Sequence, residues 1–148
     1  MENEETTFDN QVPASETSGN TQNHERSSLK EMANNFNLVN YEYVKALKIA
    51  GHTSIADMIF KEAMALCYAA NLSSEAIGRN RFVEFLEGGY YSSGRILMLY
   101  DFSKSIGVED NVREGLVDSV TGMHKIFAAS LKTVRNKAAK AQAEQVTF

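Results

Sequence analysis

The segment GRNRFVEFLEGGYYSSGRILMLYDFSKSIG, Gly78 to Gly107, has the apolar spacing of one long helix but carries small residues at its centre. A glycine inside a helix costs about 1 kcal/mol relative to alanine. At 100° per residue, one side of this helix places small residues between bulky ones: Phe85, Gly89, Ser92, Ser93 and Ile96. We predict that this set, the seam, lets a neighbouring helix approach closely, so that the packing gained offsets the lost propensity. The alternative is that Gly88 and Gly89 bend or break the helix.

A second side of the same helix is also largely apolar. It carries five residues, which we name the outer flank: Gly88, Tyr91, Arg95, Met98 and Phe102. A helix that is apolar on more than one side needs more than one partner surface. We therefore predict that the outer flank forms a contact between copies of the chain in a homo-oligomer. The alternative is that the first helix or the N-terminal tail covers it.

Glycines punctuate the chain around this segment. Gly51, Gly78 and Gly107 divide it into four pieces, and no proline follows Pro13, which is typical of packed helices. Capping-box patterns precede three of the pieces: Ser28 with Glu31, Ser54 with Asp57, and Asn111 with Glu114. The apolar spacing predicts helices near residues 29–50, 53–71, 79–106 and 111–141. Because short connections favour antiparallel neighbours, the predicted fold is all-α, an antiparallel up-down four-helix bundle.

Length and composition indicate one domain with a polar N-terminal tail. A chain of 148 residues with 43% hydrophobic content can bury one core and is too short to expect two. We predict that residues 1–27 form a disordered acidic tail, residues 28–141 the bundle, and residues 142–148 a frayed C-terminus. The net charge of -4 belongs to the tail, because residues 1–30 carry six acids and two bases while the remainder is balanced.

The sequence offers little support for a membrane or catalytic role. It has no apolar run long enough to span a bilayer and no secretory signal, so we expect a soluble cytoplasmic protein without membrane contact. No phosphate-binding loop, nucleophile elbow or zinc-binding motif occurs, and His24, His52 and His124 lack ligand spacing. The single cysteine, Cys67, is expected to be a small buried side chain. We predict no enzymatic activity, no metal, no cofactor and no small-molecule substrate.

The last predicted helix ends in a basic stretch, SLKTVRNKAAKAQAEQ, residues 130–145. Four of its residues, which we name the basic set, are cations: Lys132, Arg135, Lys137 and Lys140. Such a set can contact the phosphates of a nucleic acid, and each contact adds to the salt dependence of binding. The alternative is that these cations only favour the helix macrodipole and aid solubility.

Residues 70–135 resemble the second half of the four-helix-bundle family of 23S rRNA intervening-sequence proteins. The resemblance is carried by the following residues: Gly78-Arg79, Phe85-Leu86, Ser92 to Gly94, Leu97 and Gly107. The chain departs from the family in having LSSEAIG, residues 72–78, in place of a Pro-x-Asn-Ile-Ala-Glu-Gly turn, and in lacking the tryptophan often found in the first helix.

This resemblance implies a small non-enzymatic bundle that assembles into a ring-like homo-oligomer, often a pentamer. The related accessory variability proteins of diversity-generating retroelements associate with a reverse transcriptase and its RNA through basic surfaces. Together with the basic set, this leads us to expect an accessory scaffold for RNA or a ribonucleoprotein partner. The alternative is a protein-only adaptor or structural subunit of phage or mobile-element origin, with partners docking on the outer flank.

Overall fold

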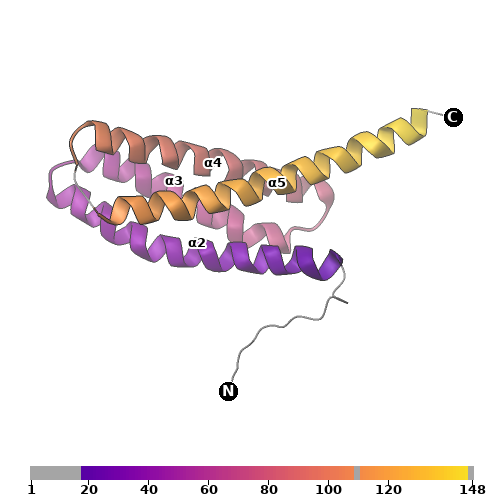
Figure 1. Cartoon of the computed structure of the whole chain (residues 1–148), viewed down its shortest axis with the longest axis horizontal. Helices are drawn as coiled ribbons and strands as arrows, with labels where there is room; N and C mark the ends of the chain where they lie inside the picture. The colour runs from indigo at the N-terminus through magenta and orange to yellow at the C-terminus, as the bar shows by residue number, and fades with distance from the viewer. Residues whose placement is uncertain (1–17, 109–110, 147–148) are drawn as a thin grey trace, which may run out of the picture.

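The computed structural model describes residues 18–108 and 111–146 of the chain. Within these residues, four α-helices and one short 3-10 helix follow one another: α2 Ser18–Ile49, α3 Thr53–Leu72, η1 Ser73–Glu75, α4 Arg79–Ser105 and α5 Val112–Val146. No strand occurs among the described residues. Figure 1 shows the four long helices side by side, with the C-terminal part of α5 extending beyond the others. The predicted all-α bundle is therefore confirmed.

The helices occupy the corners of a square. α2 packs against α3 and α5, and α4 packs against the same two helices. Because each connection is short, successive helices run in opposite directions, as in an up-down bundle. The connections from α2 to α3 and from α4 to α5 lie at one end, and the start of α2, the connection from α3 to α4 and the end of α5 lie at the other.

Two glycines end helices in the same way. Gly51 and Gly107 have φ values of 94° and 89°, which L side chains rarely adopt. The Gly51 N–H donates to the Lys48 carbonyl at 3.0 Å, and the His52 N–H donates to the Leu47 carbonyl at 2.8 Å. This pair of bonds is the Schellman pattern, and the same pair recurs after α4 at Gly107. The glycine positions thus confirm the predicted divisions between helices.

The helix ends differ from prediction at three places. α2 begins at Ser18 rather than near residue 29, so the predicted capping box at Ser28 lies inside the helix; once a helix is nucleated, each added residue gains a hydrogen bond. His52 closes the Schellman turn of α2 and is already the N-cap of α3, which leaves Ser54 two positions too late to cap. α5 continues to Val146 instead of fraying from residue 142. Residues 1–17 of the predicted tail and residues 147–148 lie outside the described residues.

The core draws large apolar side chains from all four helices. Its largest fully buried members include Tyr43 and Leu47 of α2, Leu66 of α3, Tyr100 of α4 and Phe127 of α5. A buried stripe along each helix therefore faces the centre of the bundle, which is the expected result of three-to-four apolar spacing.

A buried polar cluster joins the diagonal pair α2 and α4. The Tyr100 hydroxyl donates to Asn40 Oδ1 at 2.6 Å, and the Tyr43 and Ser103 hydroxyls are 2.8 Å apart. The rings of Tyr43 and Tyr100 meet edge-on with centroids 5.6 Å apart. Among the described residues, Asn40 Nδ2 is buried without a hydrogen-bond partner. Long polar side chains thus connect two helices whose backbones are not neighbours.

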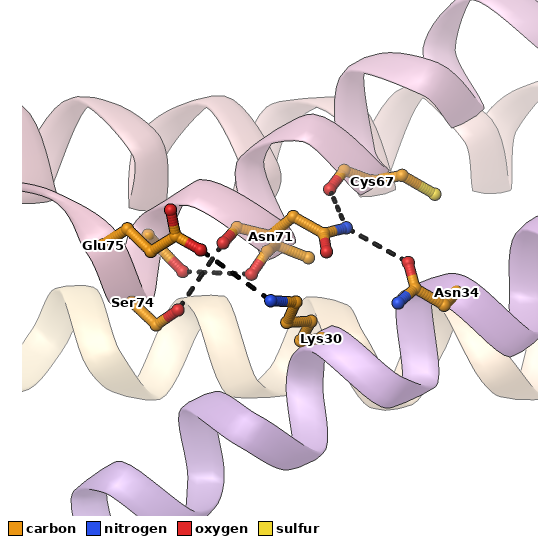
Figure 2. A network of polar contacts seen from close by, with 8 residues as sticks. Lys30, Asn34, Cys67, Asn71, Ser74 and Glu75 are labelled. Atoms are coloured by element: carbon orange, nitrogen blue, oxygen red, sulfur yellow. Dashed lines mark hydrogen bonds and ion pairs between the residues drawn. The ribbon is translucent and has the colours of Figure 1, made fainter.

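Polar contacts also fix the end of α3 to α2 (Figure 2). The Asn71 amide donates to the Cys67 carbonyl at 2.8 Å and to Asn34 Oδ1 of α2 at 3.2 Å. Lys30 and Glu75 form an exposed ion pair at 3.7 Å beside them. These contacts hold η1 against α2. They therefore fix the segment that connects α3 to α4 to the neighbouring helix.

Candidate functional site

The seam is a close contact between α4 and α5. Gly89 is buried, and a Cβ placed there would overlap the ring of Phe127, which is itself fully buried. Ser92, Ser93 and Ile96 are also buried. A side chain at residue 89 would therefore occupy space that the Phe127 ring already fills, and glycine is the residue that allows α5 to pack this closely. α4 runs without interruption through Gly88 and Gly89, so neither residue breaks it.

The seam differs from prediction at its N-terminal end. Phe85 is only half-buried, and its ring meets Tyr68 of α3 edge-on with centroids 5.9 Å apart. The next residue, Leu86, is buried in its place. A one-residue step rotates by 100°, so Leu86 rather than Phe85 aligns with the buried stripe.

His124 of α5 occupies the position beside the seam. Its Nδ1 lies 2.7 Å from the Ser93 hydroxyl, and its ring stacks on Tyr90 with centroids 4.5 Å apart. The Cβ of a residue at Gly94 would be 3.7 Å from the His124 ring, an ordinary contact distance. Gly94, which the sequence pattern leaves without a role, thus borders this histidine. Helical spacing relates residues within one helix, so it could not predict that Ser93 contacts a residue of another helix.

The outer flank lies on the exposed side of α4, as its helical spacing requires. Tyr91, Met98 and Phe102 are 55%, 61% and 53% exposed, and a side chain at Gly88 would enter open space. Arg95 is not free, because its Nε donates to Glu62 Oε2 of α3 at 2.8 Å. The structure therefore presents exposed apolar side chains along α4 with one internally neutralised charge between them.

A groove extends the outer flank onto α3. It has a volume of about 560 Å³ and lies between the start of α3 and the end of α4. Its apolar lining combines residues of both helices and the turn after α4: Ile55, Met58, Met98, Leu99, Phe102 and Ile106. Met58, which is 54% exposed, lies on a different helix from the outer flank, so helical spacing within residues 79–106 does not reveal that it belongs to the same surface. Two outer-flank residues, Met98 and Phe102, thus form part of one wall of an apolar depression shared by two helices.

The basic set lies where α5 leaves the bundle. Residue 134 is the last partly buried position of α5, and residues 135–145 are exposed on every side. We name residues 135–146 the α5 extension. Arg135 pairs with Glu87 of α4 at 3.3 Å, whereas no ion pair within the described residues involves Lys132, Lys137 or Lys140. Three of the four predicted cations are therefore exposed and form no ion pair within the described residues.

Two arginines of α4 add to the basic character of this end. Arg79 Nη2 donates to the Val134 carbonyl at 2.9 Å, which places it beside the root of the α5 extension. Arg81, in the first turn of α4, forms an exposed pair with Glu84 at 3.6 Å. The sequence resemblance includes Arg79, but only the folded structure shows that it lies next to the basic set.

Three further features bear on possible chemistry: the single cysteine, groups of metal-ligand side chains, and helices long enough to span a membrane. Cys67 is buried, and desolvation raises the pKa of its thiol to about 11, so it is a poor nucleophile at neutral pH. In the described part of the chain, no three His, Cys, Asp or Glu side chains come together as metal ligands would. No helix among the described residues has both the length and the apolar content to cross a bilayer.

Comparison with known proteins shows a shared fold. No protein-family model and no curated protein sequence matches the chain. A solved structure does: a protein of unknown function from the S23 ribosomal protein family of Bacteroides thetaiotaomicron has a TM-score of 0.68 to this chain. The likeness covers 73% of this chain and 98% of that one at 12% sequence identity. At that identity the likeness shows the arrangement of helices.

Proposed function

We propose that this chain is a non-enzymatic, homo-oligomeric scaffold that binds RNA, as an accessory subunit of a ribonucleoprotein of the reverse-transcriptase type. The observation that carries the proposal is the α5 extension. Its residues 135–145 are exposed beyond the packed bundle, and three exposed cations in or just before it, Lys132, Lys137 and Lys140, form no ion pair within the described residues. A projecting basic helix offers its cations to phosphates without removing any side chain from the core.

The fold supports the same proposal. The shared architecture with a member of the S23 ribosomal protein family agrees with the sequence resemblance to 23S rRNA intervening-sequence proteins. Arg79, which belongs to that resemblance, lies beside Val134 at the root of the extension. Arg79 and the basic set thus lie at the same end of the bundle, which supports the proposal.

Self-association is the second part of the proposal. Tyr91, Met98 and Phe102 are each more than half exposed and line one side of α4, and the groove continues this apolar surface onto Met58 of α3. Contiguous exposed apolar surface of this kind marks interaction sites on soluble proteins. We propose that the outer flank is the contact between copies, in a ring such as the pentamer implied by the resemblance.

RNA binding can be tested with two charge-matched triple variants. The first replaces three lysines of the basic set with glutamine: Lys132, Lys137 and Lys140. The second replaces one exposed lysine on each of the other helices: Lys45, Lys61 and Lys104. Binding of a labelled single-stranded RNA is followed by fluorescence anisotropy at several salt concentrations. Because each lost phosphate contact lowers the slope of log K against log salt by about 0.7, the first variant should lose about 2 from the slope. Equal losses in both variants, or no binding by the native chain, would remove the support for an RNA site on α5.

A protein-only adaptor is the second candidate function, and the groove favours it. Its apolar lining and its internally paired charge, Arg95 with Glu62, suit a protein partner better than a nucleic acid. This reading predicts that the native chain binds no RNA at any salt concentration and that outer-flank substitutions abolish binding to its protein partner.

A further inference from the structure

The free cations of the basic set are an unbalanced charge at one end of the molecule. Arg135 is neutralised by Glu87, while Lys132, Lys137 and Lys140 are exposed and have no ion pair within the described residues. Lys30 of α2, at the same end, already pairs with Glu75 (Figure 2). Exposed cations gathered at one end of a helix attract an acidic partner, and the attraction is screened by salt.

The start of α2 lies level with these cations. α2 and α5 are antiparallel neighbours, and the Met32 side chain lies 3.2 Å from the position that a Cβ of Gly122 would take. Because the two helices are antiparallel and each rises 1.5 Å per residue, a residue n positions before Met32 lies level with the residue n positions after Gly122. Ser18 is therefore level with about residue 136 of α5. Figure 1 shows the start of α2 and the α5 extension at the same end of the bundle.

The segment that precedes α2 is negatively charged, opposite in sign to the basic set. Residues 1–17 contain no lysine or arginine and five acids: Glu2, Glu4, Glu5, Asp9 and Glu16. A chain of this length reaches up to about 60 Å when extended, whereas the α5 extension is about 18 Å long. Every lysine of the basic set is thus within reach of these carboxylates.

We propose that residues 1–17 bind the exposed lysines of the basic set, Lys132, Lys137 and Lys140, in their own chain and compete there with RNA. The contact follows from charge and placement alone, whereas its consequence for RNA rests on the proposed function. Attachment to α2 gives the segment an effective concentration on the order of millimolar at the extension, so weak ion pairs suffice to occupy it. The segment then screens the site from weakly binding polyanions, and RNA that makes many phosphate contacts displaces it.

Cross-linking tests the contact without RNA. A carbodiimide joins a carboxylate directly to a lysine amine, so treatment of the full-length chain at low salt should link Glu2, Glu4 or Glu5 to Lys132, Lys137 or Lys140. Peptide mass spectrometry of an equal mixture of isotope-labelled and unlabelled chains separates links within a chain from links between chains. High salt should abolish the links. Links spread equally over lysines elsewhere, such as Lys45, Lys61 and Lys104, or links mainly between chains, would overturn the proposal.

RNA affinity tests the competition. One full-length variant carries Glu2→Gln, Glu4→Gln and Glu5→Gln; its charge-matched control carries Glu42→Gln, Asp101→Asn and Asp118→Asn, three exposed acids of the bundle. At low salt the first variant should bind RNA about threefold to tenfold more tightly than the control. Equal affinities would overturn the competition. If cross-links form while no variant binds RNA, the contact stands and the proposed RNA function falls.

Discussion

Two adjacent glycines of α4 should respond to the same substitution with opposite signs. Gly88 and Gly89 are both in the middle of the helix, so replacing either with alanine gains about 1 kcal/mol of helix propensity. A Cβ at Gly88 meets open space, whereas one at Gly89 overlaps the Phe127 ring. Gly88→Ala should therefore stabilise the bundle, and Gly89→Ala should not.

The size of the destabilisation by Gly89→Ala depends on how easily the Phe127 ring can move away from the new Cβ. The Phe127 ring is fully buried, so it can yield only by displacing other core side chains. Overpacking of this kind costs about 1 to 3 kcal/mol. The propensity gain is common to both variants and cancels in their comparison. The free energy of unfolding should consequently be about 1 to 3 kcal/mol lower for Gly89→Ala than for Gly88→Ala.

Urea unfolding at one fixed protein concentration measures this difference. The double variant Gly89→Ala with Phe127→Leu provides a further check, because the smaller side chain vacates the space that the new methyl group needs. In that background the penalty at residue 89 should shrink or disappear. Equal stabilisation by Gly88→Ala and Gly89→Ala would refute the close contact between α4 and α5 at this point.

Two further predictions concern buried groups. Tyr100→Phe removes the donor to the buried Asn40 Oδ1, and leaving that oxygen unpaired should lower the free energy of unfolding by about 1 to 3 kcal/mol in a urea titration; no loss would show that the hydrogen bond contributes nothing. Burial raises the pKa of the Cys67 thiol from 9.0 to about 11, so the folded state keeps a proton that the unfolded chain releases. The free energy of unfolding should fall by up to about 3 kcal/mol more in the native chain than in Cys67→Ala between pH 9 and pH 11, and parallel profiles would contradict this.

The architecture was predictable because its signals are local. Positive φ at Gly51 and Gly107 needs a residue without a side chain, and apolar spacing of three to four marks a helix face without reference to any other helix. The bounds of α2 and the N-cap of α3 were wrong for a different reason. A capping pattern at Ser28 or Ser54 is common, and it has no effect when the helix has already begun.

The candidate site was predictable only in part, because contacts between helices leave little trace in one sequence. Helical spacing put Gly89 on an inward side, but nothing in the sequence named Phe127 as the ring that fills its space. For the same reason, the sequence did not predict the contact between Ser93 and His124 or the ion pair between Arg135 and Glu87, since each joins two different helices. Charge composition, by contrast, needs no fold, so the acidic residues 1–17 were evident from the sequence. Their relation to α5 required the register of α2.

The mass of the full-length chain in solution tests the central claim, a homo-oligomer joined through the outer flank, most directly. Light scattering on the purified protein should give a multiple of 16.4 kDa. Met98→Glu places a charge in the apolar contact and should reduce the mass to 16.4 kDa, whereas Leu38→Glu, at an exposed apolar position on α2, should leave the multiple unchanged. A native chain that stays at 16.4 kDa at every concentration would contradict the account.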